Sequence, residues 1–200
     1  MGSFRLWLAV IIMALSLARA ASAETSKEAV GDLVQLFESW SDSRLDTIQE
    51  KAARKIDYES ISEMAFGEEQ WRSFTPAQRS DLRQSLRQLL QTRYYSRWHR
   101  LFSRSTINIA GEVKRGNDSY VKSFIHDGKV EDVVIWHLHS HKGQPMVVDL
   151  NVNGKDLVKR LSERLHKQLK KRGPEALVAW LHREAYYLPV DRYKHYSDSQ

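Results

Sequence analysis

Apolar positions in the first third of the chain recur at the spacing of a helix. Within residues 25–40, apolar side chains stand three or four positions apart, which predicts an amphipathic helix. A weaker helical pattern covers 45–55. A short helix is then predicted between Asp57, a candidate N-cap, and Gly67, a residue type that commonly ends helices.

The strongest helical signal begins at Thr75. This residue is the predicted N-cap, Pro76 is the first helical residue, and Gln78 is the third residue of a capping box. Beyond them, leucines fall on one side of the pattern and arginines largely on the other. The sequence therefore predicts one long helix from Pro76 to about Phe102.

From Thr106 the period changes to two, which is typical of β-strands. The predicted strands begin near Thr106 and then cover 120–125, 130–139 and 146–152. Glycine-containing turn signals separate them, and such short links favour an antiparallel meander of four strands. Its buried face is expected to carry Val130, Val134, Trp136, Leu138, Val148, Leu150 and Val152.

Two more helices are predicted after the sheet. The first covers 154–172 and stops at Gly173, and the second runs from Pro174 through His182. Helices before and after a meander predict an α+β fold, in which N- and C-terminal helices cover one face of the four-stranded sheet.

The first 23 residues have the features of a secretory signal. Arg5 precedes an apolar stretch, and Ala21-Ser22-Ala23 is a small-residue cleavage site. We expect cleavage after Ala23 and a free protein without stable membrane insertion, with a retained anchor as the alternative. Residues 24–183 would form one domain and 184–200 a tail. The chain has no cysteine, which excludes a disulfide framework and a lipoprotein anchor.

The formal net charge of +6 is mildly basic. It suits anionic surfaces or partners but is weak evidence for nucleic-acid binding, and export argues further against that class. A cluster of basic residues shares the 154–172 helix with four leucines, at Leu157, Leu161, Leu165 and Leu169. It is either the solvated face of an amphipathic helix or a docking surface, and a packed core with such a surface would make the protein an envelope adaptor.

An aromatic-rich apolar set is the main candidate for a functional site. Its members are Trp71, Phe74, Leu82, Leu86, Leu89, Tyr94, Trp98, Trp136, Val148, Leu150, Leu157 and Leu161. Periodicity cannot distinguish a filled core from a lined cavity, so both interpretations stay open here.

Catalytic and metal-binding patterns are poor. His137, His139 and His141 alternate along one strand and can be zinc ligands or a solvated face, but no fourth ligand is evident. Asp149 with a nearby histidine could serve as an acid–base pair in a sheet-lined pocket, or could simply be a structural cap. A periplasmic enzyme is therefore an alternative hypothesis rather than the main one.

Several segments resemble the MlaC family in order and spacing. They are Ile56-Asp57-Tyr58, Ala65-Phe66-Gly67, Trp71-Arg72, Thr75 to Arg79, Leu89 to Tyr94, Asp149 to Leu157, and Gly173 with Leu177 and Leu181. The resemblance spans about Val30 to His182. Departures occur at Pro145, where the family usually has tryptophan, at Asp156 in place of serine, and at Ser162 in place of arginine.

The resemblance implies a periplasmic phospholipid carrier of Gram-negative bacteria, not an enzyme. Acyl tails would enter between sheet and helices, so the twelve-residue set would line a lipid cavity. The implied partners are phospholipid, an outer-membrane lipoprotein complex and the substrate-binding component of an inner-membrane ABC transporter. No cofactor or metal is implied beyond the lipid cargo, and the protein would help to maintain outer-membrane lipid asymmetry.

Overall fold

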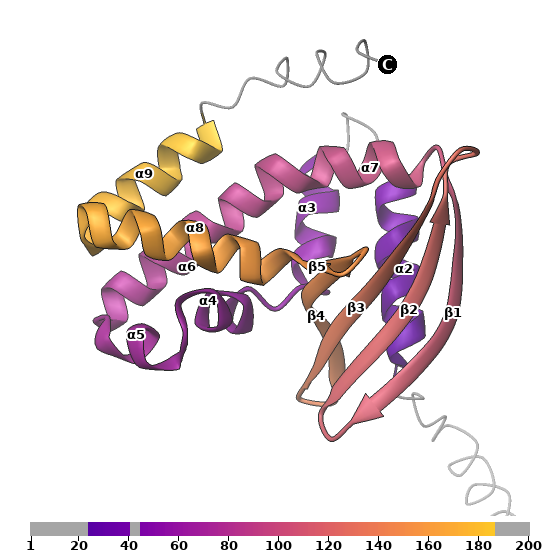
Figure 1. The fold of residues 1–200 in the computed structure, drawn as a ribbon, viewed down its shortest axis with the longest axis horizontal. Helices are drawn as coiled ribbons and strands as arrows, with labels where there is room; N and C mark the ends of the chain where they lie inside the picture. Colours follow the sequence, from indigo (N-terminus) through magenta and orange to yellow (C-terminus); the bar gives the residue numbers. More distant parts are fainter. Residues whose placement is uncertain (1–23, 41–44, 187–200) are drawn as a thin grey trace, which may run out of the picture.

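The computed structural model describes residues 24–40 and 45–186. An antiparallel sheet stands on one side of the molecule and a group of helices on the other (Figure 1). The predicted signal sequence and the end of the predicted tail lie outside the described residues. Within the described residues, no helix has the length and apolar character needed to cross a membrane.

The N-terminal helices begin and end where local chemistry predicts. Helix α2 (Ser26–Glu38) starts with a capping box between Thr25 and Glu28. Helix α3 (Leu45–Ala53) precedes α4 (Tyr58–Phe66), where the Asp57 side chain accepts from the Ser60 N–H at 3.0 Å. Gly67 ends α4 with a φ of 78°, and the short helix α5 (Glu68–Ser73) comes next.

The predicted long helix is interrupted by a π-helical segment. Helix α6 (Pro76–Leu90) opens with the predicted capping box, but the π segment η2 (Gln91–Tyr95) separates it from α7 (Ser96–Phe102). A π turn holds more than the usual 3.6 residues and therefore rotates the rest of the helix relative to α6. As a result Tyr95, not Tyr94, continues the buried side of α6 and is 0% exposed.

The sheet has five strands rather than the predicted four, in the order β1-β2-β3-β4-β5. These are β1 (Thr106–Arg115), β2 (Asp118–His126), β3 (Glu131–His141), β4 (Gln144–Val152) and β5 (Lys155–Asp156). The extra strand arises because Asn153 and Gly154 adopt positive φ angles of 51° and 80° and turn the chain back along β4. Helix α8 (Leu157–Arg172) consequently begins three residues later than predicted.

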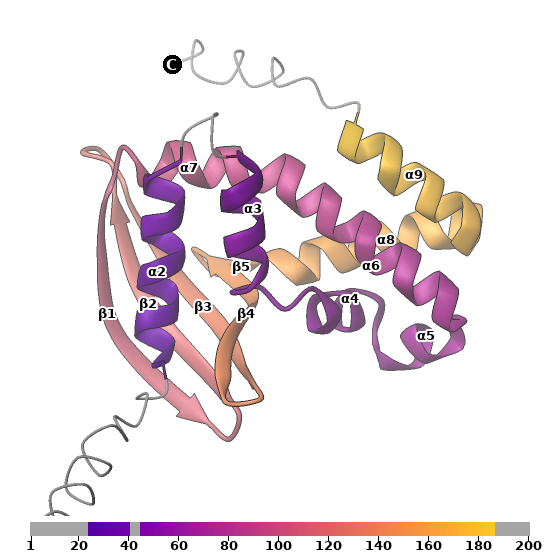
Figure 2. The ribbon, with the colours of Figure 1, turned by 180° about the vertical axis from the view of Figure 1, so that it is seen from behind.

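Helix α2 lies across one face of the sheet, as both ribbon views show (Figures 1 and 2). The buried face includes Val134, Trp136 and Leu138 as predicted, but two predicted members are exposed. Val130 is 58% exposed because it belongs to the turn held by the Asp127 carboxylate, and Val152 is 39% exposed at the end of its strand.

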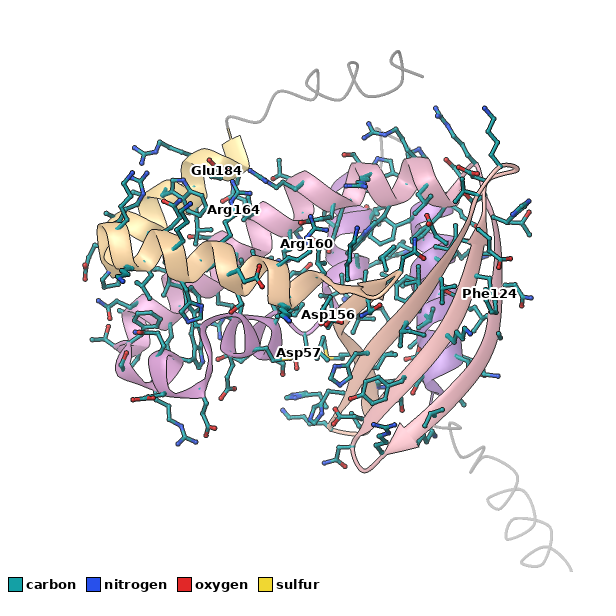
Figure 3. The ribbon with its side chains drawn as sticks, viewed as in Figure 1. Asp57, Phe124, Asp156, Arg160, Arg164 and Glu184 are labelled. Atoms are coloured by element: carbon teal, nitrogen blue, oxygen red, sulfur yellow. The ribbon has the colours of Figure 1, made fainter. Side chains whose placement is uncertain are left out.

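Helix α9 (Pro174–Tyr186) extends beyond its predicted end at His182. The added turn is held by Glu184, whose carboxylate pairs with Arg164 of α8 at 2.7 Å and also with Arg93 of η2. Figure 3 labels Arg164 and Glu184 next to each other near the C-terminal end of α9. Two cations from two elements therefore fasten a segment that has no clear hydrophobic period of its own.

Candidate functional site

A small apolar cavity lies where β4, α8, α4 and the α6–η2–α7 helix meet. Its volume is about 30 Å³. The lining residues are Ile56, Tyr58, Ile61, Leu90, Tyr95, Trp98, Val147, Val148, Asp149, Leu150, Leu157, Val158 and Leu161. Such a lining can hold hydrocarbon and offers few polar groups for binding a water-soluble ligand.

A bulge in β4 provides two neighbouring lining residues. His137 lies opposite Asp149, but the next pair joins Leu138 to Val147, so Val148 is an extra residue on β4. Both valines are consequently buried, where a regular strand would bury only one of two neighbours. The bulge therefore places a second apolar side chain at the cavity wall.

The segment before α4 closes the free edge of β4. The Asp57 N–H donates to the Val147 carbonyl at 3.0 Å, and the Val147 N–H donates to the Lys55 carbonyl at 2.8 Å. This parallel bridge brings Ile56 to the cavity, and α4 contributes Tyr58 and Ile61. Residues about ninety positions apart in the sequence thus form one wall.

Two tyrosine hydroxyls are hydrogen-bonded to each other at the cavity wall. Tyr58 comes from α4 and Tyr95 from η2, and both side chains are buried. Burial raises the pKa of both phenols, so the pair stays protonated and neutral at physiological pH. Their mutual hydrogen bond satisfies polar atoms that would be costly to bury unpaired.

Asp149 acts as a cap and not as half of a histidine pair. Its Oδ1 accepts from the N–H of Val158 in the first turn of α8 at 2.9 Å, and from the Leu150 N–H at 2.7 Å. The nearby histidines use another carboxylate, since Asp118 Oδ1 lies 3.1 Å from His137 Nε2 and 3.0 Å from His139 Nδ1. The acid–base pair considered from the sequence is therefore not formed.

Replacing Asp149 by asparagine is expected to raise the free energy of unfolding relative to wild type, and to raise it more at neutral pH than at acidic pH. Burial raises the pKa of the Asp149 carboxyl, so the folded state holds this proton more tightly than the unfolded chain. The stabilisation that this bound proton gives to the folded state is present at low pH and is lost as the pH rises through the raised pKa. An asparagine side chain at this position would keep an oxygen for the Val158 N–H without the buried charge.

The measurement is urea unfolding of wild type and Asp149→Asn between about pH 4 and pH 7. The free energy of unfolding of the variant, relative to wild type, should grow as the pH rises. Asp149→Ala is the matched control, because it removes the cap together with the charge, and loss of the cap should cost about 0.5–2 kcal/mol. A constant difference between wild type and Asp149→Asn would contradict the assignment.

The structure divides the twelve-residue set predicted from the sequence. Five members line the cavity, namely Trp98, Val148, Leu150, Leu157 and Leu161. The others lie elsewhere. Trp71 and Phe74 pack with Phe66 at ring-centroid distances of 5.8 and 5.4 Å from it. Leu82, Leu86 and Leu89 are buried on α6, and Tyr94 lies beside Trp98.

Trp136 belongs to the core under the sheet. It is 1% exposed, and its indole N–H donates to the buried Ser123 hydroxyl at 2.8 Å. The lining residues absent from the predicted set include Ile56, Tyr58, Ile61, Tyr95 and Val147. The apolar spacing of Ile56, Tyr58 and Ile61 was the available signal for the first three. No local sequence pattern predicts the π segment that places Tyr95 at the cavity wall.

The basic residues of α8 lie mostly on its solvent side. Lys159, Arg160, Lys167, Lys170 and Lys171 are exposed, whereas Arg164 pairs with Glu184 and its guanidinium carbon lies 5.2 Å from the Trp180 ring centroid. His137 and His139 alternate with the buried Trp136 and Leu138 and so point to the sheet face opposite the core. Across residues 24–40 and 45–186, no group of three histidine or carboxylate side chains has the arrangement of a metal site.

Comparison with known proteins gives a match to a protein family and to solved structures of the same fold. The family model described as "MlaC protein" matches residues 23–183. No curated protein matches the chain. Among solved structures, a phospholipid-binding protein from Ralstonia solanacearum, determined in complex with a phospholipid, superposes with a TM-score of 0.71 at 19% identity. The match covers 83% of this chain and 98% of that one, and it shows a shared fold.

Proposed function

The chain belongs to the MlaC family, and from this premise we propose that it carries phospholipid with the acyl tails held in the apolar cavity. The single observation that carries the proposal is the cavity lining, which joins β4, α8 and the helices around Tyr58 and Tyr95 almost entirely through hydrocarbon. The fold shared with a phospholipid-binding protein supports it.

Shielding the tails is what a carrier must do. Each methylene removed from water is worth ~0.8 kcal/mol, so a lipid with on the order of thirty methylenes needs more than about 20 kcal/mol to cross water unaided. An enclosed apolar site removes most of that cost while leaving a polar headgroup near the surface. No bond has to be made or broken, so we propose a carrier and not an enzyme.

The cavity has to widen to admit tails. Its volume of about 30 Å³ is far below the roughly 300–1,000 Å³ typical of ligand sites. We propose that the described conformation is a contracted state, in which Leu157 and Leu161 of α8 have moved toward Tyr95 and Trp98. The π segment supports this, because such segments mark places where a helix departs from regular geometry, frequently at functional sites.

The family suggests where the carrier works. We propose that the protein is exported to the periplasm with cleavage after Ala23, as the sequence of residues 1–23 predicts. There it would move phospholipid between an outer-membrane lipoprotein complex and the substrate-binding component of an inner-membrane ABC transporter, and so maintain lipid asymmetry. The exposed basic residues of α8 are available for contact with acidic partners.

Native mass spectrometry of the periplasmically expressed protein tests the carrier function. We expect discrete added masses that extraction identifies as phospholipid, and a melting temperature that falls when the lipid is removed. A lipid-free mass, together with a melting temperature unaffected by added phospholipid, would favour a filled core and overturn the proposal.

A further inference from the structure

A polar groove lies on the far side of the cavity wall. It is an open hollow of about 800 Å³ on the exposed side of α6, on the face of the molecule where α3 and α9 flank α6 (Figure 2). Its lining residues are Gln49, Tyr58, Ser80, Arg83, Gln84, Arg87, Gln88, Gln91, Thr92 and His182. We call this the glutamine–arginine groove.

The groove has the chemistry of an anion site. Its charged lining consists of two arginines, and none of the described residues that line it is acidic. Arg83 is already paired with Glu59 of α4. Arg87 is exposed and has no carboxylate partner among the side chains of residues 24–40 and 47–185, so its charge remains available for a ligand. Amide and hydroxyl side chains around it can donate further hydrogen bonds to phosphate oxygens.

Tyr58 joins the groove to the apolar cavity, since its side chain lines both. The Arg87 guanidinium carbon lies 5.5 Å from the centroid of the Tyr58 ring. Gln91, the first residue of η2, also lines the groove, and its side-chain amide interacts with the hydroxyls of Tyr58 and Tyr95. Tyr58 therefore lies at the boundary between the hydrocarbon lining of the cavity and the polar lining of the groove.

A second hollow beside the cavity has the wrong charge for a phosphate. This hollow of about 450 Å³ shares Asp149 and Val158 with the cavity and is also lined by Asp156, Glu163 and Lys159. Asp156 marks this side in Figure 3, at the start of α8. Three carboxylates against one ammonium group disfavour a second anion, whereas the glutamine–arginine groove attracts one.

We propose that the phosphate of the bound lipid lies in the glutamine–arginine groove against Arg87, with the acyl tails passing beside Tyr58 into the apolar cavity. The proposal rests on the carrier function proposed above and gives the lipid a direction within the protein. The proposal requires the ligand to be a phosphate ester, because the amide and arginine side chains of the groove bind phosphate and do not select for acyl tails.

The test compares two ligands with identical acyl chains, phosphatidylglycerol and diacylglycerol, of which only the first has a phosphoglycerol headgroup. Binding to each, supplied from vesicles, is measured for wild type, Arg87→Glu and Arg97→Glu. Arg97 is the matched control, since it is exposed on α7 of the same interrupted helix but does not line the groove. Glycerol 3-phosphate is tested separately as a phosphate without tails.

We expect Arg87→Glu to weaken phosphatidylglycerol binding about tenfold, and to leave diacylglycerol binding within about twofold of wild type. Arg97→Glu should bind both like wild type. Equal phosphatidylglycerol binding by wild type and Arg87→Glu overturns the headgroup site alone. Failure of wild type to bind either lipid overturns the carrier function itself. Arg87-dependent binding of glycerol 3-phosphate without lipid binding would assign the groove to free phosphate and overturn the headgroup proposal.

Discussion

Replacing Leu161 by glutamate is expected to abolish lipid retention while leaving the secondary structure in place. Leu161 faces the cavity from α8 and is largely buried there. An ionised carboxylate in hydrocarbon surroundings costs several kcal/mol unless it is paired, and the residues that line the cavity include no cation. The lost affinity should therefore exceed a hundredfold, which is about 2.8 kcal/mol.

The measurement is the amount of phospholipid phosphorus that co-purifies per protein, together with far-ultraviolet circular dichroism. Lys167→Glu is the matched control, because Lys167 is exposed on the same helix and lies away from the cavity. Leu157→Glu provides a second variant at a half-buried position of the cavity wall, where folding is less affected. Wild-type lipid content in both cavity variants would exclude this cavity as the tail site.

Replacing Trp136 by alanine is expected to cost more folding stability than any lipid-site change. The side chain is almost fully buried, contacts Phe102 at a centroid distance of 6.2 Å, and satisfies the Ser123 hydroxyl. Truncating a buried tryptophan to alanine costs about 3–5 kcal/mol. For a domain of this size the midpoint of thermal unfolding should fall by roughly 10 °C.

The measurement is thermal unfolding of lipid-free protein, because bound lipid would itself shift the midpoint. Phe124→Ala is the matched control. Phe124 lies on the neighbouring strand but on the solvent side of the sheet, where Figure 3 labels it, and it is only half-buried. The Phe124→Ala variant should lower the midpoint of thermal unfolding by no more than about 3 °C. Equal losses in the two variants would show that Trp136 is not the centre of this core.

Local chemistry explains why most elements could be predicted. The Thr75 capping box, the Asp57 cap and the Gly67 stop each depend on residues within four positions of one another. The antiparallel meander could be inferred from short links, since a two-residue turn joins only antiparallel neighbours. These features form in the same way however the rest of the chain folds.

The errors concern residues whose place depends on distant segments. The sequence pattern starts the 154–172 helix at Gly154, but pairing of Lys155 with Val152 competes for the same backbone groups. Tyr95 replaces Tyr94 in the core because a π turn comes after Leu90. Val148 reaches the cavity only because β4 bulges opposite His137.

By itself the sequence determined the α+β class, the helix boundaries set by caps, the alternating strands and the family. These depend on periodicity and short-range hydrogen bonding, which can be recognised along the chain. Only the tertiary structure decided which apolar residues fill the core and which line a cavity. Trp136 and Leu150 lie opposite each other in the sheet and are both buried, yet only Leu150 lines the cavity. The difference lies in what packs above each strand, and that depends on contacts between segments far apart in the sequence.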